Sequence, residues 1–258
     1  MLIVYRILIN LVFFLSPIIL IIRLFKKKED FFRFKEKFCF FSKKRKEGKI
    51  IWFHGASVGE LQSVVPILEN LEKNKKINQI LVTSNTLSSS KVINKLKLKK
   101  IIHQFYPIDM NFLSKKFINY WKPSSVYFID SEIWPNMIQN LKAQDVPIML
   151  LNGRITKKTF KRWKLFPSLS KKIFSTFDSC LSSSKESYNY LKKLGARKIK
   201  YIGNLKFAQS ENEKIMINKN LKKIIISRKS WCASSTHNNE EIFCAKIHIK
   251  LKKKISKF

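Results

Sequence analysis

Short apolar runs alternate with amphipathic stretches along most of this chain. The short runs are rich in β-branched and aromatic residues and predict strands, while the longer stretches repeat apolar residues at helical spacing. Strands that alternate with helices in this way indicate βαβ units and a parallel sheet. The predicted strands cover residues 49–54, 79–84, 101–106, 125–130, 147–151, 179–182 and 198–202.

Helices are predicted between these strands. Gly195 is expected to end the last helix as a C′ residue, and Asp109, after the third strand, is expected to cap a helix. Six or seven strands in this order make a doubly wound α/β domain, a Rossmann-like parallel sheet over residues 49–207. Ligands in such sheets bind at the carboxyl ends of the strands. The predicted helices cover residues 61–74, 88–97, 112–120, 135–143, 169–177 and 185–194.

The N-terminus breaks this pattern with an uncharged apolar run over residues 7–22. The run falls just short of the ~20 residues that span a bilayer core, and no small-residue cleavage site of a signal peptide follows it. Arg23 and the lysines at 26–28 follow instead, so the bulk of the chain is expected on the cytoplasmic side. A helix with Pro17 near its middle either spans thinly or lies in the interface. A buried core helix is the alternative.

Composition restricts the class of protein. The chain has 258 residues, of which 45% are hydrophobic and 27% charged, so disorder, collagen and a polytopic membrane protein are disfavoured. Lys and Arg number 52 against 17 Asp and Glu, which gives a net charge of +35. Such an excess calls for an anionic partner, namely nucleic acid, a phosphorylated substrate or an acidic lipid surface. A drift toward Lys and Asn on solvated faces is the competing explanation.

The four cysteines, Cys39, Cys180, Cys232 and Cys244, form no CxxC pair and lie apart from histidine clusters. A zinc site is therefore not expected. The chain is also too long and too poor in cysteine for a disulfide scaffold, which favours a reducing environment.

The loop after the first strand, residues 54–60, reads His-Gly-Ala-Ser-Val-Gly-Glu. Its glycines let the backbone approach a ligand, and the N–H groups at the start of the next helix face an anion. Glu60 lies in the first turn of that helix, where a carboxylate complements the helix dipole by about 0.3–1 kcal/mol. At the lip of a cleft the same carboxylate can accept a proton from a substrate hydroxyl.

Charged residues also follow later strands. Asp130 and Glu132 come directly after the fourth strand, where unpaired acids near a core cost free energy. Packing therefore explains this pair less easily than a functional role does, and pairing with basic neighbours is the alternative. Arg154 follows the fifth strand and Lys206 the last. If these four groups and Glu60 converge on one edge, they form a cleft with both signs of charge, suited to group transfer involving an anionic substrate.

Five motifs stand in order along the chain. They are His-Gly-Ala-Ser-Val-Gly-Glu at 54–60, Glu-Ile-Trp-Pro-Asn at 132–136, Asn-Gly-Arg at 152–154, Gly-Asn-Leu-Lys-Phe at 203–207 and Ala-Ser-Ser-Thr-His at 233–237. Together they resemble the 3-deoxy-D-manno-octulosonic acid (Kdo) transferases. The opening of the chain, Tyr5-Arg6, an apolar run with Pro17 and then Arg23, is similar too, and the resemblance covers residues 1–250.

The resemblance implies a two-domain GT-B glycosyltransferase at the cytoplasmic face of the bacterial inner membrane. Members move Kdo from CMP-Kdo to the lipid A precursor in lipopolysaccharide synthesis, with the acceptor on the N-terminal domain and the donor on the C-terminal one. No metal or cofactor beside the donor is implied. The implied catalytic residues are Glu60 as general base with Asp130 and Lys206 assisting the transition state; His54, Ser57, Gly59, Glu132, Asn136 and Arg154 bind the acceptor, and Ser235, Thr236 and His237 lie on the donor side.

The expected organisation follows from these features: a membrane-anchor helix at 1–25, a basic connector at 26–48, the acceptor domain at 49–207, a linker at 208–222 and the start of a donor domain at 223–258. A full second domain needs about 150 residues more, so these residues alone are expected to lack transferase activity, as a truncated product or as a half that works with a separate donor domain. Asp130 departs from the family's Glu, which is one methylene longer.

The expected partners are the lipid A precursor, anionic inner-membrane lipids, and CMP-Kdo only where a donor domain is supplied. The alternative is a basic protein without catalysis that binds nucleic acid or a membrane. It leaves Glu60 and the acidic turn at 130–132 unexplained, so no specific nucleic acid is expected.

Overall fold

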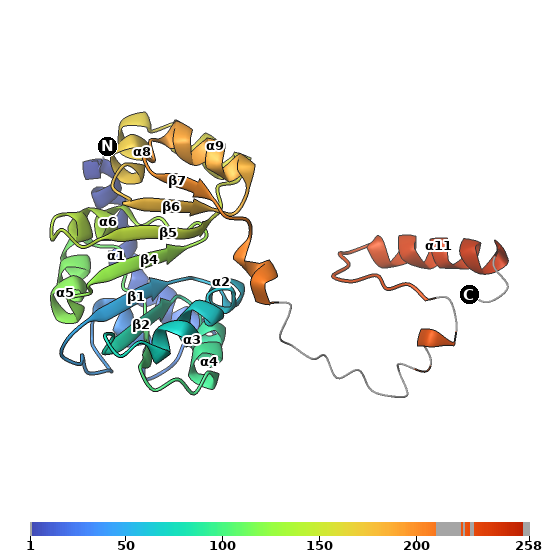
Figure 1. Cartoon of the computed structure of the whole chain (residues 1–258), viewed down its shortest axis with the longest axis horizontal. Helices are drawn as coiled ribbons and strands as arrows, with labels where there is room; N and C mark the ends of the chain where they lie inside the picture. Colours follow the sequence, from blue (N-terminus) through green and yellow to red (C-terminus); the bar gives the residue numbers. More distant parts are fainter. Residues whose placement is uncertain (1, 210–222, 224, 228–229, 255–258) are drawn as a thin grey trace. The chain divides into compact units, whose positions relative to one another are not determined.

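The computed structural model describes residues 2–209, 223, 225–227 and 230–254. The chain divides into two compact units, Met1–Glu211 and Asn212–Phe258, and the first contains the whole sheet (Figure 1).

Seven parallel strands form one sheet in the order β3-β2-β1-β4-β5-β6-β7. Every predicted strand is present, so the predicted fold class, a doubly wound Rossmann-like sheet, is confirmed. The order reverses between β1 and β4, which lie side by side although two strands separate them in sequence. The strands are β1 (Ile50–His54), β2 (Gln79–Ser84), β3 (Ile101–Phe105), β4 (Ser125–Ile129), β5 (Ile148–Gly153), β6 (Ser179–Ser182) and β7 (Ile199–Tyr201).

Both faces of the sheet are buried, because neighbouring side chains along a strand point to opposite faces. Trp52 and Phe128 belong to the core on one face, together with apolar residues of α5, α6, α8 and α9. Phe53 and Ile129, one position further along each strand, belong to a second core under α2, α3 and α4. The continuously apolar strands therefore form the central sheet, with a layer of helices on each of its two faces.

The helices largely follow the prediction, with two differences. One helix was predicted over residues 61–74, but the chain forms α2 and α3, because Pro66 starts a new helix and cannot continue the old one. The short helix α7 was not predicted. The helices are α2 (Val58–Ser63), α3 (Val65–Lys73), α4 (Leu87–Lys95), α5 (Asn111–Trp121), α6 (Pro135–Lys142), α7 (Lys157–Lys164), α8 (Pro167–Phe174), α9 (Lys185–Leu194) and the 3₁₀ turn η2 (Leu205–Gln209).

The N-terminal helix α1 (Leu2–Phe25) is the one helix in the described part of the chain that is long and apolar enough to cross a membrane. It also contacts the first unit along its length. The hydroxyl of Tyr5 donates to Asp109 at 2.7 Å, Phe13 packs edge-on against Phe38, and Leu20 is buried. Most of its other apolar side chains are exposed, and Leu2, Ile9 and Leu24 are half-buried.

The basic connector at 26–48 is folded against the domain, with a 3₁₀ turn η1 (Phe34–Phe38) at its centre. Glu36 is 1% exposed, pairs with Arg33 at 2.7 Å and accepts the backbone N–H of Phe105. Further on, Phe41 stacks on Tyr120 with ring centroids 3.7 Å apart. The segment therefore belongs to the packed structure of the first unit.

The second unit contains helix α11 (Glu240–Lys254). Among the described residues before it, 223, 225 and 226 are helical and 230–239 contain no strand. A strand there has no described neighbour to share its backbone hydrogen bonds. The predicted linker at 208–222 lies outside the described residues from 210 onward.

Candidate active site

The candidate site lies where the strand order reverses. In a doubly wound sheet the loops after two adjacent strands diverge to opposite faces at this point and leave a crevice at the carboxyl edge. β1 and β4 are these strands, and the loops that follow them carry Glu60 and Asp130. Figure 1 shows α2 on the side of the sheet toward which the strands point.

Glu60 is held by a capping box at the start of α2. Ser57 Oγ accepts the N–H of Glu60, and the Glu60 carboxylate accepts the N–H of Ala56 at 2.7 Å and the hydroxyl of Ser57 at 2.8 Å. A weaker contact comes from the Ser57 N–H at 3.5 Å. An ionised carboxylate has about four acceptor positions. Glu60 is thus fixed in place, forms no ion pair with a described residue, and keeps capacity for one more donor.

Asp130 is the most unusual residue of the site. Its φ of +61° lies in the left-handed region, its exposed fraction is 6%, and its Oδ1 atom has no hydrogen-bond partner among the described residues. Burial raises the pKa of Asp130, and the negative charges of Glu60 and Glu132 add to this, while Lys206 and Arg154 oppose it. Glu60, Glu132, Lys206 and Arg154 therefore all lie within electrostatic range of Asp130.

Lys206 is placed by η2, which contacts α2. The backbone N–H of Leu205 donates to Asn152 Oδ1 at 3.0 Å, and Asn152 itself is buried with φ +52°. A Cβ atom on Gly59 would lie 3.6 Å from Lys206 Nζ. The ammonium group of Lys206 therefore lies against the turn that carries Glu60.

Arg154 is held by its backbone, whose N–H donates to the carbonyl of Asp130 at 3.1 Å, and its side chain is exposed. This bond joins the loops after β4 and β5. The guanidinium is therefore free to meet an anion at the edge of the crevice.

Glu132, His54 and Trp134 form a hydrogen-bonded cluster next to Asp130. His54 Nε2 lies 3.2 Å from Glu132 Oε2, and Trp134 Nε1 donates to the same oxygen at 2.9 Å. Burial favours a higher pKa for Glu132, but the hydrogen bond and charge of His54 and the indole of Trp134 outweigh it and lower that pKa. Glu132 is therefore held as the anion. The ring of His54 stacks on Tyr106 with centroids 3.8 Å apart.

Two residues that the resemblance assigns to acceptor binding are completely buried, namely His54 and Asn136. The Asn136 side chain donates to the Asp109 carbonyl at 2.6 Å and accepts from Arg6 Nε at 3.0 Å. The prediction of direct contact does not fit these positions, because neither side chain presents a free surface. Both residues instead support the wall of the site.

Asp109 caps a helix as predicted, but the helix is α6 rather than its sequence neighbour. Its carboxylate accepts the N–H groups of Asn136 and Met137 at 2.9 and 2.8 Å, in addition to the Tyr5 hydroxyl. Helix α6 starts with Trp134 and Pro135, which provide no side-chain cap of their own. A sequence pattern cannot reveal a cap that comes from another loop.

Ser235, Thr236 and His237 lie in the second unit, before α11. The Thr236 hydroxyl donates to Glu241 Oε1 at 3.1 Å, and the N–H of His237 donates to Glu240 Oε2 at 2.8 Å. They are described only within that unit. Among the described residues no group of three His, Cys, Asp or Glu side chains is arranged to hold a metal ion.

Sequence reasoning missed Asn152, Trp134 and the box formed by Ser57. The Ser-x-x-Glu spacing at 57–60 is the signal of a capping box and predicts that contact. Asn is among the few residues that tolerate the left-handed region, which is a weaker signal for Asn152. Trp134 had no such signal, because one of its partners, His54, comes from the distant strand β1.

The fold defines the class as Rossmann-like α/β proteins, here with charged residues at the point where the strand order reverses. A solved protein from Listeria monocytogenes, described as a UDP-N-acetylglucosamine 2-epimerase, is similar in fold, with a TM-score of 0.50 and 14% identity over 71% of this chain and 53% of that one. The family model for 3-deoxy-D-manno-octulosonic-acid transferase (kdotransferase) matches residues 32–209, and the chain belongs to this family.

Curated relatives agree. The chain is 35% identical over 251 residues to the 3-deoxy-D-manno-octulosonic acid transferase of Rickettsia bellii, with 94% of this chain and 59% of that protein covered. The Haemophilus influenzae protein of the same name is 25% identical over 77% of this chain and 47% of its own length. The chain thus spans about half the length of the curated relatives it matches.

Proposed function

We propose that residues 49–207 form the acceptor side of a Kdo transferase, in which Kdo moves from CMP-Kdo to a lipid A precursor. The observation that carries this proposal is that Glu60, Glu132, Arg154 and Lys206 all lie within electrostatic range of Asp130, beside the paired strands β1 and β4. Family membership and the ordered motifs at these positions support it. Transfer also requires a CMP-Kdo-binding domain, to which Ser235, Thr236 and His237 would belong.

In this proposal Glu60 is the general base. A primary hydroxyl of the acceptor loses its proton to the Glu60 carboxylate as its oxygen bonds to the anomeric carbon of Kdo. The bond from that carbon to the phosphate of CMP breaks on the opposite face, and CMP leaves with the electron pair. Lys206 and Asp130 act on the charge that develops at the sugar. The capping box holds Glu60 in one orientation, which favours catalysis.

We also propose that α1 attaches the chain to the cytoplasmic face of a bacterial inner membrane by lying in the interface. The contacts of Tyr5, Phe13 and Leu20 hold the helix along the domain, which favours an in-plane position over a crossing. Its outward side is apolar, with Ile7, Leu11 and Phe14 exposed. The net charge of +35 favours anionic lipid at that surface.

The test is transfer of labelled Kdo from CMP-Kdo to lipid A precursor in vesicles. The full chain is assayed with and without a donor-binding domain taken from the Rickettsia bellii relative. The proposal expects transfer when the domain is added, and a loss of at least about 100-fold in Glu60→Gln. Glutamine is accepted at the third helical position of a capping box, so this variant keeps the fold. Glu69→Gln, an exposed acid on α3, is the matched control.

A second measurement addresses the alternative, a basic protein without catalysis. The chain is titrated with DNA and with vesicles that contain or lack lipid A precursor. Preference for vesicles that contain the precursor is expected. Tight, sequence-independent DNA binding without lipid preference would favour the alternative.

A further inference from the structure

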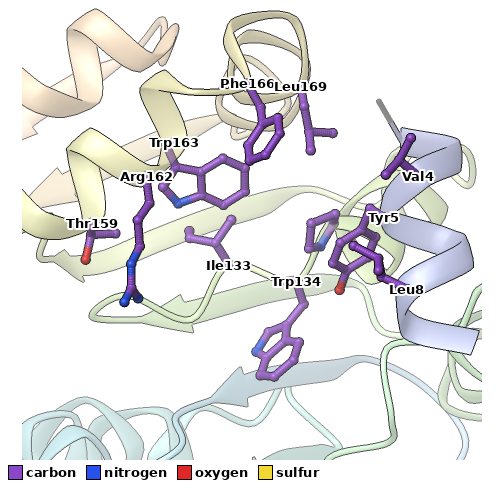
Figure 2. A pocket seen from close by; sticks show the side chains of 11 residues that line it. Val4, Tyr5, Leu8, Ile133, Trp134, Thr159, Arg162, Trp163, Phe166 and Leu169 are labelled. Carbon is purple, nitrogen blue, oxygen red and sulfur yellow. The ribbon is translucent and has the colours of Figure 1, made fainter. Parts of the chain in front are cut away.

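An apolar pocket of about 440 Å³ opens beside the candidate active site, between α1, the loop before α6, and helices α7 and α8. Ligand pockets commonly have volumes of roughly 300–1,000 Å³. In Figure 2, Val4, Tyr5 and Leu8 of α1 face Trp163, Phe166 and Leu169 across this space. The pocket is thus large enough for a hydrocarbon ligand.

The pocket is continuous with the outward apolar side of α1. Val4 and Leu8 line it, and they are also 51% and 58% exposed. If α1 lies in the membrane interface, as proposed above, a lipid chain passes from the bilayer into the pocket without crossing water. Burial of each methylene group then favours entry.

Positive charge lies at the mouth of the pocket. Arg162 is the only charged side chain among the eleven described residues that line it. Its helix α7 carries four lysines as well, Lys157, Lys158, Lys161 and Lys164, and no acid. This arrangement fits an amphiphile with an apolar chain and a phosphorylated head, and it disfavours an apolar peptide, which has no matching negative charge.

The pocket also shares a wall with the candidate active site. Trp134 lines the pocket, and its indole N–H donates to Glu132 and lies 3.1 Å from His54 Nε2 in the site. A lipid held by its chain here therefore places its head next to the edge of the sheet that carries Glu60 and Asp130.

We propose that this pocket holds one acyl chain of the phosphorylated lipid acceptor. This inference rests on the proposed function, and it explains how the proposed transferase recognises a lipid acceptor. Chain binding fixes the acceptor at the membrane surface and brings its hydroxyl to the base, so the pocket contributes through position rather than chemistry.

The experiment uses photo-crosslinking in phosphatidylcholine vesicles. The probe is lysophosphatidic acid, which has one acyl chain and a phosphate monoester head, with a diazirine at the end of the chain. After illumination, mass spectrometry of the full-length chain maps the labelled residues. The expected label lies on Trp163, Phe166 or Leu169, in the pocket lining, rather than on outward positions of α1 such as Ile7 and Leu11.

Two variants of α1 give a matched comparison. Leu8 and Leu11 are 58% and 59% exposed, but only Leu8 lines the pocket. Leu8→Glu and Leu11→Glu weaken membrane contact alike, and neither removes a core side chain. Leu8→Glu is expected to lower labelling of the pocket residues at least about fivefold relative to Leu11→Glu, because a carboxylate now faces the chain.

Label spread over α1, equal losses in both variants, or no label in the pocket would each overturn the proposal. The outcomes also separate this inference from the proposed function. Glu60-dependent Kdo transfer without selective labelling refutes the pocket alone, whereas selective labelling without transfer refutes the transferase proposal and leaves a lipid-binding pocket.

Discussion

Asp109 makes the stability of the first unit depend on pH in a direction opposite to most carboxylates. It is 1% exposed, and burial raises its pKa from the ordinary 3.8 to about 6, although hydrogen bonds from Tyr5, Asn136, Met137 and Ser114 oppose the shift. The folded state therefore binds the proton more tightly than the unfolded state. Ionisation between pH 3.8 and 6 costs stability, and protonation restores it.

The magnitude follows from the two pKa values. One pKa unit corresponds to 1.36 kcal/mol, so the full effect is about 3 kcal/mol, of which about 2 kcal/mol is present at pH 4. The variant Asp109→Asn cannot ionise. The free energy of unfolding of the natural chain minus that of the variant should therefore rise by about 2 kcal/mol from pH 7 to pH 4, because all other titrating groups cancel.

The assay is urea unfolding in mild detergent at several pH values, followed by tryptophan fluorescence. Asp145→Asn, at an exposed position, is the control, and its difference from the natural chain should not vary in the same way. A flat profile for Asp109→Asn would show that its pKa is not raised. A difference that falls toward pH 4 would show that the four donors outweigh burial, and the reasoning would be refuted.

Three substitutions test separate features by the same unfolding assay. Gly195→Ala, at φ +107°, places a Cβ 2.9 Å from a backbone atom of α8 and should lower the free energy of unfolding by about 2–3 kcal/mol. Gly203→Ala should cost less, because a Cβ there meets nothing within 4 Å. Glu36→Gln leaves Arg33 without its buried partner and should lower the free energy of unfolding by about 3 kcal/mol. A double-mutant cycle with Arg33→Met measures the coupling energy between the two side chains. Asn152→Ala removes the hydrogen bond to η2 and places alanine at a positive φ, and it should lower the free energy of unfolding by about 2–3 kcal/mol. Asn152→Gly removes the same hydrogen bond but tolerates the positive φ, so its loss should be smaller. Equal losses in the two variants would exclude a contribution from backbone strain.

The sheet was predictable because each strand is an apolar run buried on both faces, and a pattern of this kind has one stable solution in a parallel sheet. The positions after the strands followed from the same geometry, so the placement of Glu60 after β1 and of Asp130 after β4 could be predicted. Helix α7 was not, because its eight residues include five basic ones and no buried side chain. It packs only through the half-buried Phe160 and Trp163.

The roles of some motif residues depend on their burial, which the sequence alone does not reveal. His54 and Asn136 carry polar groups in motif positions, and such groups either face a ligand or satisfy the backbone of a neighbouring element. Which of the two applies depends on partners far away in sequence, here Arg6 and Asp109 for Asn136. The pocket beside α1 had no sequence signal for the same reason, since its walls come from three separated segments.

Asp130 allows a final test of whether this edge is shaped for catalysis rather than for stability. Its raised pKa, left-handed backbone and unpartnered Oδ1 atom all cost folding free energy. Asp130→Asn removes the charge beside Glu60 and Glu132 and keeps the tolerance for positive φ. We expect the variant to be more stable at pH 7 and to lose Kdo transfer with the added donor domain. Natural sites keep such unfavourable groups where activity needs them. A variant that is less stable, or one that transfers Kdo at the natural rate, would show that Asp130 serves the fold and that the charged crevice works without it.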